Sequence, residues 1–549
     1  MFLLGIVLLN VVVQFSRVRF DLTEDKRFSL SETTLQLLNS TDKEFDIVLY
    51  LDGEMNSGFR RLKDATTDIL REMGQYATIR YSTLNPVEDL TDQQRKRLWQ
   101  TLVEQGLSPR PVSEHDYRGR TIQTMVYPFA EVHQGSKKQI VNLFQYNRGY
   151  DESENLNHSI ETLEYAFAEC FCQLIDSVFP KVAFLEGHQE LPEQYTWDLQ
   201  QAVAKYANIY RGSITNDATC LDDFDAVVIA DPQQPFSERD KYVLDQYLMN
   251  GGSLLWAVSG VKLSEESLTD RGFTPIIPLD LNITDLLFRY GIRINPCLVA
   301  DRQCLYIPVD VSPDPQQPSY QPMSWFYSPL LLPSEDHPIS RDLMPVSATF
   351  CSVIDTVGDM GDIKKSVLLT TSNASRLVPA PSDVNLMDLN MDTRLFTRSF
   401  VPVAIVLEGQ FSSLFSHRIK PDSVVETRPV KKMSESVKQV VIASGLMAQN
   451  DVRNGQPMPL GYDSYTKTQF GNRDFLLNAI LYLIDNRGLV DLRQKTIPIR
   501  MLNMKRIEQS RSKIQALSSI VPLLVLLIVA FVIVGTRKYK YTSYKTINQ

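Results

Sequence analysis

Three short apolar segments separated by amphipathic stretches constrain the fold of this chain more than any other feature. They are Lys181–Leu185 (KVAFL), Phe224–Ala230 (FDAVVIA) and Ser253–Val258 (SLLWAV). A strand reads as a continuous apolar run when both faces of its sheet are covered, as in parallel sheets. Helical spacing fills the two intervals, and Ser237 is placed to cap the second helix, Glu238–Met249. The sequence therefore predicts an α/β domain with a doubly wound parallel sheet, amidotransferase- or flavodoxin-like.

Polar residues follow each of these strands, where doubly wound sheets bind their ligands. His188 lies between two glutamates, so a carboxylate could orient it as a general base. A hydrogen-bonded loop that caps the following helix is the alternative interpretation. Ser259 is a candidate nucleophile, but the sequence around it lacks the G-x-C-x-G or G-x-S-x-G pattern of a strand-to-helix nucleophile. The residues expected to bind a ligand or partner are Gly187, His188, Gln189, Glu190, Asp231 and Ser259.

Residues 179–500 are expected to form this doubly wound domain, with long insertions after Gly260. The segment Pro308–Pro338 is crowded with prolines and predicts long loops. Other apolar runs predict strands at Val367–Thr371, Val403–Leu407 and Val440–Ala443, and a helix at Asn472–Asp485.

Residues 16–178 predict a second α/β domain with the element order β-α-β-α-β-β and a further helix. Its last two strands are expected at Thr121–Val132 and Lys138–Phe144, and one long helix at Glu154–Val178. This order resembles a thioredoxin-like domain. The CxxC motif of a redox enzyme is missing, because Asp52-Gly53-Glu54-Met55 follows the first strand, and redox catalysis is therefore excluded.

Apolar segments stand at both ends of the chain. Ile520–Val534 (IVPLLVLLIVAFVIV) carries no charge, and a helix of about twenty such residues crosses a bilayer core of about 30 Å. We expect a transmembrane helix at 516–536 and an N-terminal membrane anchor at 1–15. A slight excess of basic residues after the second segment favours a cytoplasmic tail and an external body. The flanking segments are then a basic juxtamembrane helix at 501–515 and a basic cytoplasmic tail at 537–549.

Composition excludes several classes of function. The net charge of −9 provides no basic surface for nucleic acid. The six cysteines are scattered, and neither CxxC pairs nor histidines at ligand spacing predict a zinc site. No G-x-x-x-x-G-K-[ST] motif occurs, so the chain does not itself hydrolyse nucleotides by the P-loop mechanism. We expect no metal and no cofactor.

Three features together resemble one family. They are Phe20–Ser31 (FDLTEDKRFSLS) after an apolar N-terminus, Val182–Glu190 (VAFLEGHQE) at the start of the doubly wound unit, and the single C-terminal apolar segment with its basic tail. In these the chain resembles the gliding-motility auxiliary proteins of ABC transporters, the GldG-like family. The resemblance covers nearly the whole chain, and the DLTEDKRFSLS stretch is its most specific part.

The resemblance implies a non-enzymatic auxiliary subunit in the inner membrane of a bacterium of the Bacteroidetes type. Its implied partners are a separate ABC permease, a cytoplasmic ABC ATPase and membrane lipid. The body is implied to face the periplasm, and the doubly wound unit to be a non-catalytic interaction module shared with intraflagellar transport proteins. Two alternatives stay open from the residues alone: a membrane-tethered hydrolase using His188 and Ser259, and a glycan-binding module using the loop 187–190.

Overall fold

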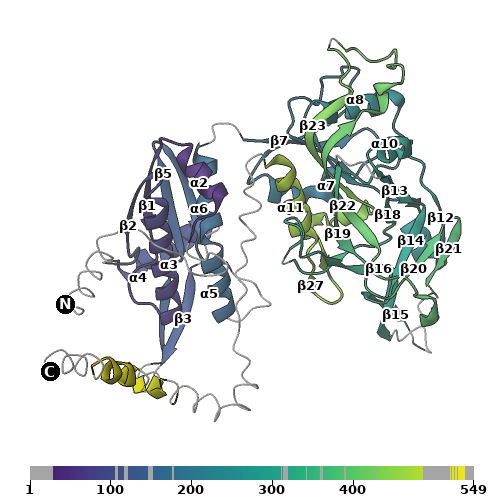
Figure 1. Cartoon of the computed structure of the whole chain (residues 1–549). Coiled ribbons are helices and arrows are strands. Elements are labelled where there is room, and N and C mark those ends of the chain that lie inside the picture. Colours follow the sequence, from purple (N-terminus) through teal and green to yellow (C-terminus); the bar gives the residue numbers. More distant parts are fainter. Residues whose placement is uncertain are drawn as a thin grey trace, which may run out of the picture. The chain divides into compact units, whose positions relative to one another are not determined.

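The computed structural model describes residues 29–485, apart from positions 89, 105–108, 116–120, 146–151, 176–178, 311, 313–318, 342, 359–362, 387, 389–390 and 427, and parts of a helical stretch at 520–537 (Figure 1). The described part of 29–485 belongs to one compact unit, and the described part of 520–537 belongs to another. The named helices and strands lie in the first unit, where two main hydrophobic cores form around two separate sheets.

The sheet nearer the N-terminus has the strand order β2-β1-β5-β6. Strand β1 (Glu44–Leu49) is parallel to β2 (Thr78–Thr83) and antiparallel to β5 (Phe129–Gln134), which pairs with β6 (Lys137–Asn142). Helix α3 (Ser57–Met73) connects the two parallel strands and buries an apolar stripe at helical spacing. The other helices here are α2 (Glu32–Asn39), α4 (Asp92–Glu104), α5 (Glu152–Glu161) and α6 (Leu163–Ile175).

Two predictions for this region were wrong in detail. The segment 121–132 is not one strand, because the chain breaks before β5 at Pro128, which has no N–H to donate to a ladder. Strand β4 (Thr121–Val126) instead pairs with β3 (Arg110–His115) in a separate hairpin. The single helix predicted at 154–178 is divided between α5 and α6.

The larger sheet has the strand order β15-β16-β19-β22-β23-β10-β9-β7-β8 in the described residues. From β8 to β23 every pairing is parallel, and from β23 to β15 every pairing is antiparallel. The parallel strands are β7 (Lys181–Glu186), β8 (Asn208–Ser213), β9 (Ala226–Ala230), β10 (Ser253–Ala257) and β23 (Met433–Ile442). The antiparallel ones are β15 (Cys304–Asp310), β16 (Tyr320–Pro333), β19 (Ile363–Thr370) and β22 (Pro402–Ser412).

The predicted doubly wound parallel sheet is therefore corrected to a mixed sheet, because the parallel strands continue into an antiparallel half. The prediction of long loops at 308–338 was also wrong, because β15 and β16 form an antiparallel pair there. Pro308 lies opposite Pro322 in this pair, and β15 is the edge strand of the sheet, a position where missing N–H groups are tolerated.

Helices and smaller strands surround the large sheet. The helices are α7 (Glu193–Val203), α8 (Glu238–Met249), α9 (Glu265–Arg271), α10 (Thr284–Arg289) and α11 (Asn472–Ile484), with short 3-10 turns η2 (Thr393–Leu395), η3 (Leu414–Ser416) and η4 (Leu446–Ala448). A β-rich lobe pairs β11 (Val261–Lys262) and β21 (Ser382–Asn385) with β12 (Phe273–Pro278), β13 (Ile292–Asn295) with β18 (Val353–Thr356), and β14 (Cys297–Asp301) with β20 (Ser375–Pro379). The short strands are β17 (Val346–Ser347), β24 (Val452–Arg453), β25 (Gln456–Pro457), β26 (Tyr462–Asp463) and β27 (Thr468–Gln469).

The expected pair of bracketing transmembrane helices is not supported. A membrane-spanning helix needs about twenty predominantly apolar residues, and none of the helices in the described part of the chain meets that length and apolarity. The first expected anchor, at 1–15, lies outside the described residues. The described part of the chain is accordingly a mixed α/β fold with many strands.

Replacing Trp256 by alanine is expected to destabilise the large domain. Trp256 is fully buried in β10, and its indole Nε1 donates to Gln439 Oε1 of β23 at 3.2 Å. Removing a buried indole leaves a cavity and costs about 3–5 kcal/mol. Urea denaturation measures the loss. Trp197→Ala is the matched control, because that side chain is 42% exposed and its removal is expected to change stability by only about 0.5 kcal/mol.

Candidate functional site

The loop after β7 holds a buried histidine between two carboxylates. Gly187 has φ +118°, a conformation that favours glycine, and it turns the chain so that His188 points inward. The imidazole Nδ1 lies 3.0 Å from Glu190 Oε1, and Nε2 lies 3.3 Å from Asp240 Oδ2 of α8. The ring also stacks on Phe236, with centroids 3.8 Å apart. Both polar atoms and one face of His188 are therefore engaged.

The two carboxylates keep His188 charged at neutral pH. Burial lowers its pKa, but hydrogen bonds to Asp240 and Glu190, together with their negative charges, raise the pKa to about 9. Burial also raises the pKa of Asp240, yet hydrogen bonds from His188, Ser237 and Arg239 hold that pKa well below its usual range. A protonated imidazole that donates from both nitrogens has no lone pair to accept a proton. In this arrangement His188 forms a cationic bridge between the β7 loop and α8.

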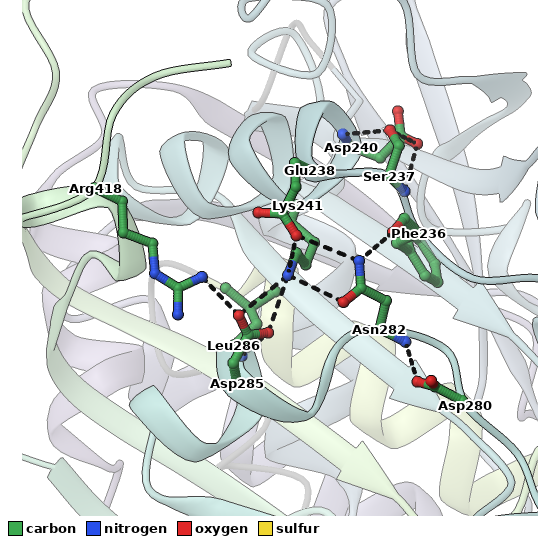
Figure 2. A network of polar contacts seen from close by, with 10 residues as sticks. All are labelled: Phe236, Ser237, Glu238, Asp240, Lys241, Asp280, Asn282, Asp285, Leu286 and Arg418. Atoms are coloured by element: carbon green, nitrogen blue, oxygen red, sulfur yellow. Dashed lines mark hydrogen bonds and ion pairs between the residues drawn. The ribbon is translucent and has the colours of Figure 1, made fainter.

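Asp240 also caps the helix that it belongs to. The Asp240 carboxylate accepts from Ser237 N and Ser237 Oγ, while Asp240 N donates to Ser237 Oγ at 3.2 Å (Figure 2). This is a capping box, which satisfies the free N–H groups of the first turn. The cap identified from Ser237 in the sequence is present. The helix that the His188 loop supports is α8, whereas the sequence favoured the next helix in the chain.

Asp231 and Ser259 form a second, separate cluster at the ends of β9 and β10. Ser259 Oγ donates to Asp231 Oδ1 at 2.8 Å and accepts from Gly445 N at 3.2 Å. Asp231 is buried, and its backbone adopts the left-handed conformation, with φ +51°. Burial raises its pKa to about 6, although hydrogen bonds from Ser259 and Gln233 lower it. A side chain at Gly445 would overlap the Asp231 carboxylate. This cluster fastens three chain segments to one another.

A cavity of about 640 Å³ opens beside the first cluster. It lies at the ends of β7 and β8 and at the start of α8, and Pro421 and Ser423 form another part of its wall. Of the six predicted residues, Gly187 and His188 line it, and Gln189, Glu190, Asp231 and Ser259 do not. Glu190 is not part of the cavity lining, and its carboxylate instead contacts Nδ1 of the His188 ring.

The structure does not join His188 and Ser259 into a nucleophile–base pair. The described hydrogen-bond partners of Ser259 are Asp231 and Gly445, and those of the His188 ring are Glu190 and Asp240. Among the described residues, no group of three or more histidine, cysteine, aspartate and glutamate side chains is arranged to hold a metal ion. Sequence reasoning missed Asp240 and Phe236. The sequence predicted a cap at Ser237, but nothing local linked Asp240 to a histidine 52 positions earlier.

Changing His188 to glutamine is expected to alter how stability depends on pH. The pKa of His188 is raised in the folded state, so its contribution is complete below the ordinary pKa of 6.5 and is lost as pH rises through about 9. Wild-type stability is expected to fall by roughly 1–3 kcal/mol over this interval, and His188→Gln should lose that part of the dependence. Urea denaturation at several pH values measures it, with the exposed His417→Gln as control. Parallel profiles for wild type and His188→Gln would contradict the bridge.

Adding one methyl group at Gly445 is expected to disrupt the second cluster. In Gly445→Ala the new Cβ meets the Asp231 carboxylate, so either the carboxylate or the loop must move. Overpacking of this kind costs about 1–3 kcal/mol. Thermal unfolding measures the change. Gly212→Ala is the matched control, because a Cβ there meets no atom within 4 Å, and an equal effect of both changes would argue against the cluster.

Comparisons with known proteins give one match over more than half of the chain. Residues 180–479 match a protein family described as ABC-type uncharacterized transport system, an ABC transporter auxiliary family. Residues 24–133 match a domain of unknown function. No curated protein matches the chain.

Solved structures add a weaker likeness. A structure titled "mmIFT52 N-terminal domain" is 16% identical, with a TM-score of 0.32 over 55% of this chain and 96% of that one. A likeness at this TM-score supports no argument about fold or function.

Proposed function

Because this chain belongs to the family of ABC-type uncharacterized transport system proteins, whose role is that of an accessory component of an ABC transport system, we propose that it is a non-catalytic subunit. In this role it binds the permease and acts together with the ABC ATPase. The observation that carries the proposal is the family match over residues 180–479, which spans the whole large sheet from β7 and most of α11.

The geometry of the strand ends supports a binding role. His188 is held as a cation by two carboxylates, and Ser259 is held by Asp231 and Gly445. Catalytic groups need a free acceptor or an activated nucleophile within hydrogen-bond reach of each other. Both clusters instead use their polar atoms to fix loops against α8 and the sheet. The predicted site residues thus serve, in this proposal, as the rigid base of a binding surface.

We further propose that the complex works at the bacterial inner membrane in gliding motility, with the α/β body on the periplasmic side. The support for this finer proposal is the resemblance of Phe20–Ser31 (FDLTEDKRFSLS) and Val182–Glu190 (VAFLEGHQE) to GldG-like proteins. A deletion of the gene that leaves cell gliding unchanged would remove this part of the proposal without affecting the accessory role.

Purification of the tagged full-length chain from native membranes in mild detergent tests the accessory role. We expect an ABC permease and an ABC ATPase to copurify in constant proportion, identified by mass spectrometry. Isolation of the chain without either subunit under several detergents would contradict the proposal.

A separate outcome would favour a hydrolase. In that case a hydrolytic activity of the purified chain would disappear in both His188→Gln and Ser259→Ala while folding stayed intact. We expect neither substitution to remove such an activity.

A further inference from the structure

A twenty-residue loop between β22 and β23 is attached to the domain at several points and also exposes apolar side chains. We name residues 413–432 the strap. Its two ends are joined, because Ser413 N donates to Lys432 O at 2.9 Å. It contains η3 and then passes along the cavity, whose wall includes Pro421 and Ser423.

The first anchor is a buried carboxylate on α8. Asp245 is fully buried, and it accepts from Ser413 Oγ at 2.6 Å and from Leu414 N at 2.8 Å. Tyr290 OH donates to the same carboxylate at 3.0 Å. Phe415 packs edge-on against Tyr242, with ring centroids 5.1 Å apart. The start of the strap is thus fixed to α8 by both polar and apolar contacts.

The second anchor is an ion-pair network that reaches the surface. Arg418 Nη1 donates to Asp285 Oδ2 at 2.6 Å, and both Asp285 oxygens accept from Lys241 Nζ at 3.1 Å (Figure 2). Lys241 is 1% exposed and also pairs with Glu238 Oε1 at 2.6 Å. A buried ammonium group that loses its partners costs several kcal/mol. Breaking this network would leave the Lys241 ammonium buried with fewer partners. The network therefore holds Arg418 in place.

The third anchor holds the far part of the strap. Val425 N donates to Asn216 O at 2.8 Å, and Val425 O accepts from Ala218 N at 3.0 Å. Arg428 pairs with Asp222. Gln246 of α8 exchanges two hydrogen bonds with the Lys431 backbone, at 2.9 and 3.1 Å. The strap is consequently attached to the domain at its start, at Arg418, and again at Val425, Arg428 and Lys431.

The strap exposes apolar side chains and carries a small excess of basic residues. Ile419 is 92% exposed and directly follows the anchored Arg418, and Val425 is 62% exposed although its own backbone is hydrogen-bonded to Asn216 and Ala218. The strap has five basic residues against two acidic ones, and three of the five, Arg418, Arg428 and Lys431, already pair with carboxylates of this chain. A loop that is already ordered loses little conformational entropy on binding, so exposed apolar side chains on it are suited to docking.

We propose that the strap is the surface that binds the permease of the transport complex, a deepening that rests on the function proposed above. Ile419 enters an apolar pocket of the permease, and a carboxylate at the rim of that pocket faces Lys432. The charge of the strap sets this choice of partner surface, because an acidic rim complements the basic excess and steers association.

A protein partner fits the strap better than a lipid surface. Segments that lie in a membrane interface insert Trp, Phe and Leu side chains on one face. The strap has one aromatic residue, Phe415, and one leucine, Leu414, and both are buried. Its exposed apolar side chains are an isoleucine and valines.

The test replaces Ile419 by aspartate in the full-length chain. Wild type and Ile419→Asp are purified from native membranes in mild detergent, and the permease is quantified by mass spectrometry. We expect at least a tenfold loss of permease with Ile419→Asp and an unchanged thermal unfolding temperature. Ile277→Asp on β12 is the matched control, because Ile277 is also exposed, at 48%, and lies away from the strap in sequence. The control is expected to retain the permease.

The remaining outcomes separate the two proposals. If wild type retains the permease and Ile419→Asp retains it equally, the strap proposal is overturned and the accessory role stands. If wild type retains no permease, the proposed function fails and the strap proposal falls with it.

Sedimentation with phosphatidylglycerol vesicles tests the lipid alternative. Vesicle binding that Ile419→Asp abolishes, with permease binding unchanged, would assign the strap to a membrane surface and overturn the proposal. A photo-reactive residue at 419 is expected to crosslink to the permease.

Discussion

The architecture of the large domain depends on the burial of α8 from every side. Nine consecutive residues, 241–249, are buried, and they include Lys241 and Asp245, while Asp240 is buried just before them. A buried charge without a partner is too costly to persist in a folded domain. Each of these three side chains therefore reaches a different neighbour. Asp240 contacts His188, Lys241 contacts Asp285, and Asp245 contacts the start of the strap.

The need to pair these buried charges explains why the loops at the strand ends are held in place by hydrogen bonds. The His188 imidazole satisfies Asp240, and its own charge is balanced by Glu190. The loop after β7 is thereby fastened to α8, and the wall of the cavity beside it is fixed. The strap is attached to α8 for the same reason. Asp245 and Lys241 are buried and need partners, which η3, α10 and Arg418 supply.

The mixed sheet creates the strap. A wholly parallel sheet needs a helical crossover between neighbouring strands. Strand β22 runs antiparallel to β23, so a loop can connect them directly, and this loop is free to extend over α8. Strand β23 also pairs in parallel with β10 on its other side, and it is the point where the two halves of the sheet meet. The surface proposed for docking thus lies at the end of the strand that joins both halves.

Sequence patterns were sufficient for elements whose signal is local. The continuous apolar runs at 181–185 and 253–258 became β7 and β10, and Ser237 caps α8 as predicted. The prolines at 308–338 led to a wrong prediction of loops. An edge strand tolerates missing N–H groups, but whether a strand lies at the edge of a sheet cannot be read from local sequence. The same limit applies to the site, since the polar residues at strand ends were visible and their partners were not.

The sequence by itself determined the α/β class, the strands β7, β9 and β10 and the cap of α8, because each follows from periodicity or from the chemistry of a few adjacent residues. Tertiary structure alone decided that His188 pairs with Asp240, that Ser259 pairs with Asp231, and that the strap is fixed to α8. These contacts join residues 28 to 168 positions apart. They form because burial leaves charged and polar groups no water to bond with, so the fold must supply a partner from elsewhere in the chain.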